Sequence, residues 1–149
     1  MKQLTFISFI FLIFASTGLR AQHFETNFNE AQNISQKEGK SMMLVFSGSD
    51  WCKPCILLKQ EILSSPSFSE FSQQNLVVLN LDFPFRKKNA LPPAQQEHNE
   101  ELAERYNPDG AFPLVLILQE DGSVAQRINF QPGMGAEPFI AQIASTISN

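Results

Sequence analysis

The sequence predicts an α/β domain with a central mixed β-sheet flanked by helices on both faces. Two observations lead to this fold class. Short apolar runs, typical of buried strands, alternate with longer segments of helical periodicity, and a tight turn joins the last two runs. In addition, both cysteines lie in one pentapeptide, Trp51-Cys52-Lys53-Pro54-Cys55, between a predicted strand and a predicted helix. The 149 residues suffice for one domain.

The N-terminal stretch is expected to be a signal peptide over residues 1–21. Lys2 precedes an apolar run over 4–15, and small residues lead to Ala21. A charged start, an apolar middle and a small-residue end are typical of secretory signals. We therefore expect cleavage after Ala21, a domain over 22–149, and a protein that is exported to the periplasm or secreted. The alternative is an uncleaved N-terminal anchor, for which the apolar run is short.

The charge of the chain argues against nucleic acid as a partner. The formal net charge is −4 at pH 7. Removal of residues 1–21 takes away Lys2 and Arg20 but no acidic residue, so the net charge becomes −6. An acidic protein without a basic stripe is poorly suited to bind a phosphate backbone. We also expect no stable membrane insertion once the signal is cleaved.

The remaining elements follow from hydrophobic periodicity and from turn residues. Thr26 or Asn27 can cap the first helix, and Gly39 can end it. The run over 76–82 is apolar almost throughout, which predicts a central strand buried on both sides. Three helices are predicted over 27–40, 95–106 and 136–147. A further helix follows the cysteines and ends or kinks at 64–67, and a short helical piece is predicted around 68–71. The predicted strands are 41–46, 76–82, 114–118 and 124–130, the last at the sheet edge.

The position of the cysteines indicates redox chemistry. A thiolate, not a thiol, attacks a disulfide, so a redox cysteine must be activated. Pro54 suits the first turn of the following helix, which places Cys52 at or just before a helix N-terminus, where free N–H groups favour an anion. These features, with the charge of Lys53, lower the pKa of Cys52. Cys55, one turn later, can resolve a mixed disulfide formed at Cys52.

Three other interpretations of the pair stay open. Half of a zinc site would need two more ligands, and neither His23 nor His98 has an obvious spacing to the pair. His98 is instead expected on an exposed polar helix face, without a role. A structural disulfide would suit an oxidising compartment, but a four-residue loop constrains little chain. The third interpretation is two inert core cysteines. The strand–turn–helix context favours redox turnover over all three.

With these residues in place, the sequence resembles the thioredoxin superfamily. The matching features are the pentapeptide 51–55 after an apolar strand and Gly110-Ala111-Phe112-Pro113 before another strand. More narrowly, residues 46–52 with Glu61 resemble small exported thioredoxin-like proteins of bacteria. They resemble, more distantly, the C-terminal domain of the thiol–disulfide interchange protein. The resemblance spans residues 24–147 and implies a thioredoxin fold.

The resemblance also implies roles for individual residues. Pro113 would form a cis peptide bond and pack beside the cysteines, which suits a proline that opens a strand. The backbone of Phe112 would then be an open edge that pairs with an extended substrate. Met134, in the loop 131–135, would lie near the cysteines as part of an apolar rim. Supporting roles would fall to Trp51, Lys53 and Pro54.

One position departs from thioredoxin itself. Thioredoxins commonly carry a buried aspartate six residues before the first cysteine, where it helps to move a proton off the second cysteine. Phe46 stands there in this chain. Asp50 is nearer to the cysteines but is expected to be exposed in a turn. Glu61 is a candidate proton acceptor for Cys55, against the simpler expectation that it is a solvated helix residue.

The segment 83–93 looks like an insertion relative to thioredoxin. It contains two phenylalanines, the cations Arg86, Lys87 and Lys88, and prolines that disfavour regular structure. One interpretation is a loop that contacts a partner or substrate. The other is a solvated loop whose phenylalanines pack on the core.

Together these inferences predict an exported thiol–disulfide oxidoreductase, a reductase rather than an oxidase, that acts on protein thiols and disulfides. No organic cofactor or metal is expected, because the redox group is the Cys52–Cys55 pair. Reducing equivalents would come from an upstream thiol protein in the membrane. The alternative is a thioredoxin-fold binding module, for a protein partner or for copper, without redox turnover.

Overall fold

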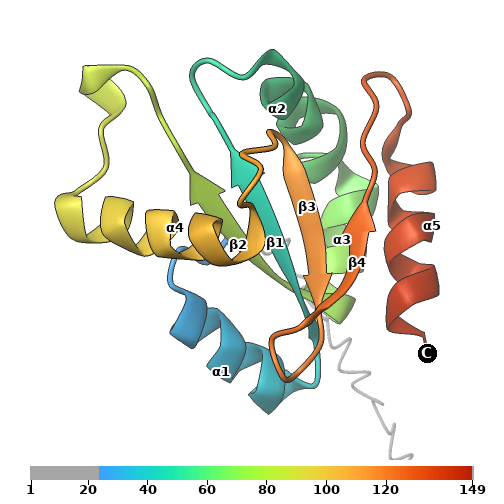
Figure 1. The fold of residues 1–149 in the computed structure, drawn as a ribbon. Helices are drawn as coiled ribbons and strands as arrows, with labels where there is room; N and C mark the ends of the chain where they lie inside the picture. Colours follow the sequence, from blue (N-terminus) through green and yellow to red (C-terminus); the bar gives the residue numbers. More distant parts are fainter. Residues whose placement is uncertain (1–23, 149) are drawn as a thin grey trace, which may run out of the picture.

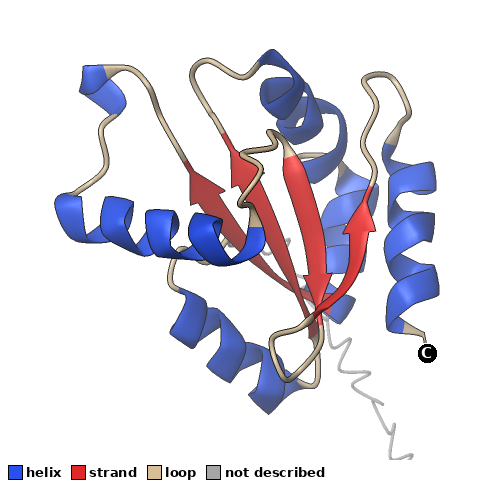
Figure 2. Cartoon of the chain, in the orientation of Figure 1, coloured by secondary structure: helices blue, strands red, loops and turns tan. Residues whose placement is uncertain are grey.

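The computed structural model describes residues 24–148 (Figures 1 and 2). The predicted signal peptide, its cleavage site and His23 lie outside the described residues. No helix in the described part of the chain is long and apolar enough to span a membrane. The elements in chain order are α1 (Phe28–Glu38), β1 (Ser41–Ser47), α2 (Lys53–Leu57), η1 (Leu58–Leu63), α3 (Pro66–Asn75), β2 (Leu76–Asp82), η2 (Lys87–Asn89), α4 (Pro93–Tyr106), β3 (Leu114–Leu118), β4 (Val124–Ile128) and α5 (Ala136–Ile147).

The four strands form one mixed sheet in the order β2-β1-β3-β4 (Figure 2). β1 pairs in parallel with β2 and antiparallel with β3, and β3 pairs antiparallel with β4. The predicted mixed sheet and the antiparallel final pair with β4 at the edge are therefore confirmed. β1 is a central strand, and its C-terminal end leads directly into the cysteine pentapeptide.

The predicted central position of the strand over 76–82 is wrong, because β2 lies at the other edge of the sheet. Its apolar run is nevertheless buried on both faces. Part of its outer edge is covered by Glu25, whose N–H donates to Val78 O at 2.8 Å and whose C=O accepts from Asn80 N–H at 2.9 Å. Two-sided burial requires cover on both faces, which an edge strand can also have.

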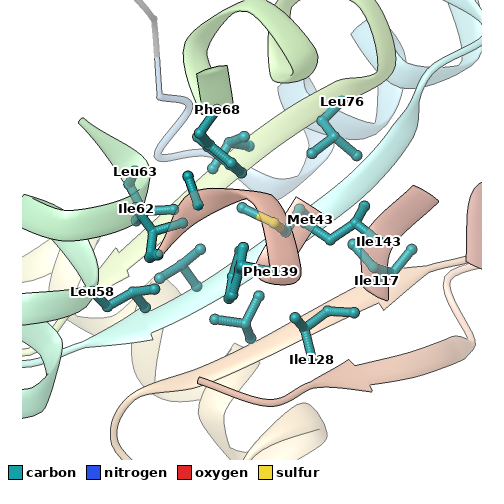
Figure 3. Close-up of a cluster of buried hydrophobic side chains, with 14 residues drawn as sticks. Met43, Leu58, Ile62, Leu63, Phe68, Leu76, Ile117, Ile128, Phe139 and Ile143 are labelled. Atoms are coloured by element: carbon teal, nitrogen blue, oxygen red, sulfur yellow. The ribbon is translucent and has the colours of Figure 1, made fainter. Parts of the chain in front are cut away.

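Helices cover both faces of the sheet, as predicted, and alternate residues of each strand face the two layers. One layer packs α1 and α4 against residues such as Leu44 and Leu79. The other layer packs η1, α3 and α5 against residues such as Met43 and Ile117, with Phe68 and Phe139 edge to face in its middle (Figure 3). The core is thus divided by the sheet into two clusters.

The start of α1 corrects one prediction from the sequence. Asn27 caps the helix by accepting from Glu30 N–H at 3.0 Å, and Gly39 ends it in the left-handed conformation, both as predicted. His98 was expected to be exposed on α4. It is instead half-buried, and its Nε2 accepts from Phe28 N–H at 3.1 Å, which links α4 to the first turn of α1.

The segment after the cysteines is shorter and less regular than one continuous α-helix. α2 has five residues and passes into the π-helical turn η1. The predicted break at 64–67 is confirmed, because Ser65 accepts from Phe68 N–H at 3.2 Å and caps a new helix that begins at Pro66. This helix, α3, has ten residues, which makes it longer than the short piece predicted around 68–71.

Candidate active site

Cys52 and Cys55 form a disulfide that follows β1 after a short turn. Cys52 is the N-cap residue of α2, and its Sγ accepts from Cys55 N–H at 3.3 Å. Pro54 lies in the first turn of the helix, as predicted. The side chains of the two residues are similarly buried, at 4% and 3% exposure, so exposure does not distinguish them. What distinguishes Cys52 is its position at the helix N-terminus, where backbone donors favour an anion.

Trp51 covers the turn that precedes the disulfide. Its indole N–H donates to Phe83 O at 2.7 Å, while half of its surface remains exposed. The indole also lies against the backbone of Gly48, where a Cβ atom would approach Trp51 Cε2 to 2.4 Å. The turn therefore requires glycine at position 48, because any side chain there would displace the tryptophan.

Pro113 forms a cis peptide bond with Phe112, as the family resemblance implied. The ladder between β1 and β3 ends at the pair Phe46–Leu114, so Phe112 and Pro113 lie just beyond it. The Phe112 ring packs edge to face on Trp51 and on Phe83, with ring centroids 5.4 Å apart in both pairs. The structure thus brings the proline segment and the cysteine pentapeptide together through aromatic contacts.

The position that carries a buried aspartate in thioredoxins is occupied here by the apolar residue Phe46. Phe46 is fully buried, and its ring stacks on Phe83 at 6.3 Å. A small pocket of about 60 Å³ nevertheless reaches Cys55. Its polar lining comes from Ser47, Ser49, Lys59 and Asn80. Cys55 therefore has polar neighbours and a cationic side chain nearby, although no carboxylate lines the pocket.

Asp50 has a function that the sequence did not suggest. Its carboxylate accepts from Phe85 N–H at 2.8 Å, from Arg86 N–H at 3.0 Å and from Asn89 Nδ2 at 2.8 Å. The hydrogen bond from the Phe85 backbone is the main reason why the pKa of Asp50 lies below its ordinary value. Asp50 lies in a turn, as expected, but it is half-buried rather than exposed, and its carboxylate anchors the 83–93 segment.

A second carboxylate holds the same turn from the end of β2. Asp82 accepts from the backbone N–H of Ser49 at 2.8 Å and from its hydroxyl at 2.6 Å. This contact was not predicted from the sequence. One feature could have indicated it. Ser47 and Asp82 end neighbouring parallel strands, and the C-terminal ends of parallel strands lie at the same edge of a sheet.

Two other candidate residues, Glu61 and Met134, have contacts at the loop before α5. Glu61, in η1, accepts from Gly133 N–H at 2.8 Å and so ties η1 to the loop before α5. Met134, in the same loop, packs against the core cluster between the sheet and α5. The role of Met134 in an apolar rim near the cysteines stays a prediction.

Two further observations concern alternative sites. Within residues 24–148, no group of three or more His, Cys, Asp or Glu side chains is gathered as metal ligands would be. A larger hollow of about 460 Å³ is lined by Ser41, at the start of β1, and Leu118, at the end of β3. It therefore lies at the end of the sheet opposite the disulfide.

Fold and site together define a thioredoxin-fold protein whose disulfide lies at the start of the first helix after β1. The chain belongs to the thioredoxin-like family, since the model of the thioredoxin-like domain matches residues 28–143. The chain is 34% identical over 121 residues to the disulfide bond reductase DsbH of Chlamydia pneumoniae, covering 81% of this chain and 70% of that protein. This likeness and the CxxC pair support assignment as a thiol–disulfide oxidoreductase.

Solved structures agree with this fold. A structure described as DsbH oxidoreductase superposes with a TM-score of 0.77 at 31% identity, covering 87% of this chain and 86% of that one. The oxidised C-terminal domain of DsbD from Neisseria meningitidis superposes with a TM-score of 0.53 at 20% identity, covering 79% and 90%. At this lower identity the second likeness concerns the fold alone.

Proposed function

We propose that this protein is an exported reductase of protein disulfides. The observation that carries the proposal is the bond from Cys55 N–H to Cys52 Sγ at the start of α2. After reduction of the disulfide, the same donor and the helix N-terminus would stabilise a thiolate at Cys52, the attacking species in exchange. The name of the 34% identical relative, a disulfide bond reductase, supports the direction of electron flow.

The reaction proceeds in two exchange steps. The Cys52 thiolate attacks one sulfur of the substrate disulfide, which breaks the substrate S–S bond and releases one thiolate that takes up a proton. Cys55 then loses its proton, and its thiolate attacks Cys52 Sγ, which breaks the mixed disulfide and releases the second substrate thiol. The substrate gains two electrons and two protons, and the protein ends as the disulfide seen in the structure.

The polar pocket beside Cys55 gives its proton a route in the second step. The pocket is lined by Ser47, Lys59 and Asn80. The buried position 46 holds phenylalanine instead of an acid and belongs to the core cluster on the other face of the sheet. A water molecule in this pocket would accept the proton, and the Lys59 ammonium would stabilise the thiolate that remains. Phe112, just beyond the β1–β3 ladder, would pair its backbone with the substrate chain, while Trp51 and Pro113 position the substrate against the sulfurs.

The cellular side of the proposal concerns export and the electron donor. Residues 1–21 are the proposed signal peptide, so the mature protein would begin at Gln22 and work in the periplasm or outside the cell. After each turnover the disulfide must be reduced again by another thiol protein, which we place in the membrane. Mass spectrometry of the protein recovered from the exported fraction tests the cleavage site.

A trapping experiment tests the enzymatic proposal against a binding module. A Cys55→Ser variant cannot resolve the mixed disulfide, so it should accumulate partners that are linked to Cys52 and released by reductant. The Cys52→Ser variant is the matched control and should trap far fewer. If both variants retain the same partners under reductant, the protein is a binding module and the reductase proposal is wrong.

The reduction potential of the pair tests the direction of electron flow. A value of about −270 mV, typical of thioredoxin, fits a reductase. A value near roughly −120 mV marks an oxidant that donates its disulfide. The measurement needs only equilibration in defined thiol buffers, with the alkylated fraction counted by mass.

A further inference from the structure

The segment after β2 presents an exposed ridge next to the disulfide. We define the basic ridge as Phe85, Arg86, Lys87 and Lys88. The Phe85 side chain is 84% exposed, and the three cations that follow it are exposed as well. Figure 1 shows this segment, which contains η2, at the same end of the sheet as α2. The exposed Phe85 and the half-exposed Trp51 offer apolar surface at the same end of the molecule as these three cations.

The basic ridge is fixed to the active site by short contacts. Asp50, two residues before Cys52, holds the backbone N–H groups of Phe85 and Arg86 at 2.8 and 3.0 Å. Phe83 O accepts from the Trp51 indole at 2.7 Å. Because the backbone of the segment is bound inward by these contacts, the ridge side chains are held outward at a set position relative to the disulfide.

Within the described residues, no ion pair holds Lys87 or Lys88 of the ridge, whereas the Asp50 carboxylate offsets part of the charge of Arg86. Lys53, beside Cys52, is exposed and adds a fourth cation at this end of the molecule. Within residues 24–148, no salt bridge holds any of the four, although α4, which follows the ridge, is rich in glutamate. In a chain of net charge −4, three lysines and Arg86 lie at one end, and Asp50 offsets only part of their charge. They therefore create a local positive field beside the redox site.

We propose that the basic ridge is a docking surface for protein substrates whose disulfide is flanked by acidic residues. The inference rests on the proposed reductase function and names its substrate class. Acidic side chains of the substrate would face Arg86, Lys87, Lys88 and Lys53. An apolar group would pack on Phe85 and the exposed part of Trp51. Such charge complementarity raises the rate of productive encounter and selects among partners, more than it adds contact energy.

Two model substrates test the proposal. They are peptides of equal length with the same intramolecular disulfide, one flanked by glutamates and one by lysines. The pre-reduced protein should reduce the acidic peptide faster, by about tenfold in kcat/KM at low ionic strength. The difference should shrink as salt increases, because the screening length falls to about 10 Å at 0.1 M. Equal rates at low salt would overturn the proposal.

Charge-reversal variants locate the effect. Lys87→Glu should lower kcat/KM for the acidic peptide, and Lys87→Glu with Lys88→Glu should abolish the preference. Lys37→Glu is the matched control, because Lys37 is exposed in the last turn of α1 at the far end of the sheet (Figure 1). Phe85→Ala should raise KM for both peptides. If Lys37→Glu reduces the preference as much as Lys87→Glu does, the ridge has no special role.

Two controls separate this inference from the proposed function. The rate of reduction of a small neutral disulfide, 2-hydroxyethyl disulfide, should be the same in all ridge variants. If the wild-type protein does not reduce this compound, the reductase proposal alone is contradicted. In that case the docking proposal is still tested by peptide binding. Fluorescence anisotropy would compare the affinity of the two peptides for a protein that carries both Cys52→Ser and Cys55→Ser. Binding to anionic vesicles that depends on Phe85 and Lys87, without peptide preference, would show a membrane contact and overturn the proposal.

Discussion

Asp50 accepts a hydrogen bond from the backbone N–H of Phe85, 35 positions later in the chain, at 2.8 Å. This contact joins the turn that carries the cysteines to the segment that follows β2. The second acceptor oxygen of Asp50 binds Arg86 N–H and the Asn89 amide. One carboxylate therefore helps to fix the position of the basic ridge relative to the turn that carries the disulfide.

The Asp50 contact should depend on pH. Because the pKa of Asp50 is lowered in the folded state, its carboxylate stabilises the segment at pH values above the ordinary carboxyl pKa of about 3.9. This stabilisation is lost as the pH falls through the lowered folded-state value. Hydrogen exchange of the Phe85 and Arg86 amides, followed by NMR, should show protection at neutral pH and loss of protection in that acid window.

A variant isolates this effect. Asp50→Asn should make both amides exchange faster at neutral pH and remove the change in acid. Asp109→Asn, in the turn before the cis proline, serves as the control for loss of one surface carboxylate. Equal protection of the two amides in Asp50→Asn and wild-type protein would mean that the contact does not hold the segment.

Gly48→Ala should displace Trp51. The new Cβ would meet Trp51 Cε2 at 2.4 Å, so the indole must move and its bond to Phe83 O is lost. We expect a destabilisation of about 1–3 kcal/mol, as for other overpacked sites, and slower reduction of peptide disulfides. Because Trp51 is the only tryptophan of the chain, its fluorescence spectrum reports the movement directly. An unchanged spectrum and unchanged kinetics would contradict the tight contact.

Lys59 and Glu61 should differ in their effect on catalysis. Lys59→Ala removes the cation from the pocket beside Cys55, so the resolving step should slow and its pH profile should move to higher pH. Glu61→Ala removes the acceptor of Gly133 N–H, which should cost about 1 kcal/mol of stability with little effect on the rate. Stopped-flow measurement of substrate release separates the two.

A different result would assign the proton transfer to Glu61 instead of the pocket at Lys59. If Glu61→Ala slows the resolving step at neutral pH while its denaturant midpoint is unchanged, Glu61 is the proton acceptor for Cys55. In that case the pocket at Lys59 does not carry the proton.

His98→Ala should destabilise the domain without changing its redox chemistry. The substitution leaves the N–H of Phe28, a buried residue, without its acceptor, and an unsatisfied buried donor costs about 1–3 kcal/mol. Urea unfolding measures the loss, and the reduction potential should stay the same. His98→Gln, which restores an acceptor, should recover part of the stability. A fully stable His98→Ala variant would mean that water replaces the histidine.

The sequence by itself determined the elements and the redox pair. Local signals were sufficient for these features, because the cap at Asn27, the left-handed Gly39 and the helix start around Pro54 depend on neighbouring residues. The two-faced burial of the strands followed in the same way from their apolar runs. The cis bond at Pro113 came from family resemblance, which the structure bears out.

The tertiary structure decided which distant residues meet. Hydrophobic periodicity could not place β2 at the edge of the sheet. A central strand and an edge strand have the same apolar pattern when both faces of the sheet are covered. It also could not show that His98 accepts from Phe28, or that Asp50 holds residues 85–89. Hydrogen bonds between residues 35 or 70 positions apart depend on how the sheet brings loops together, and no local pattern of a single sequence records that geometry.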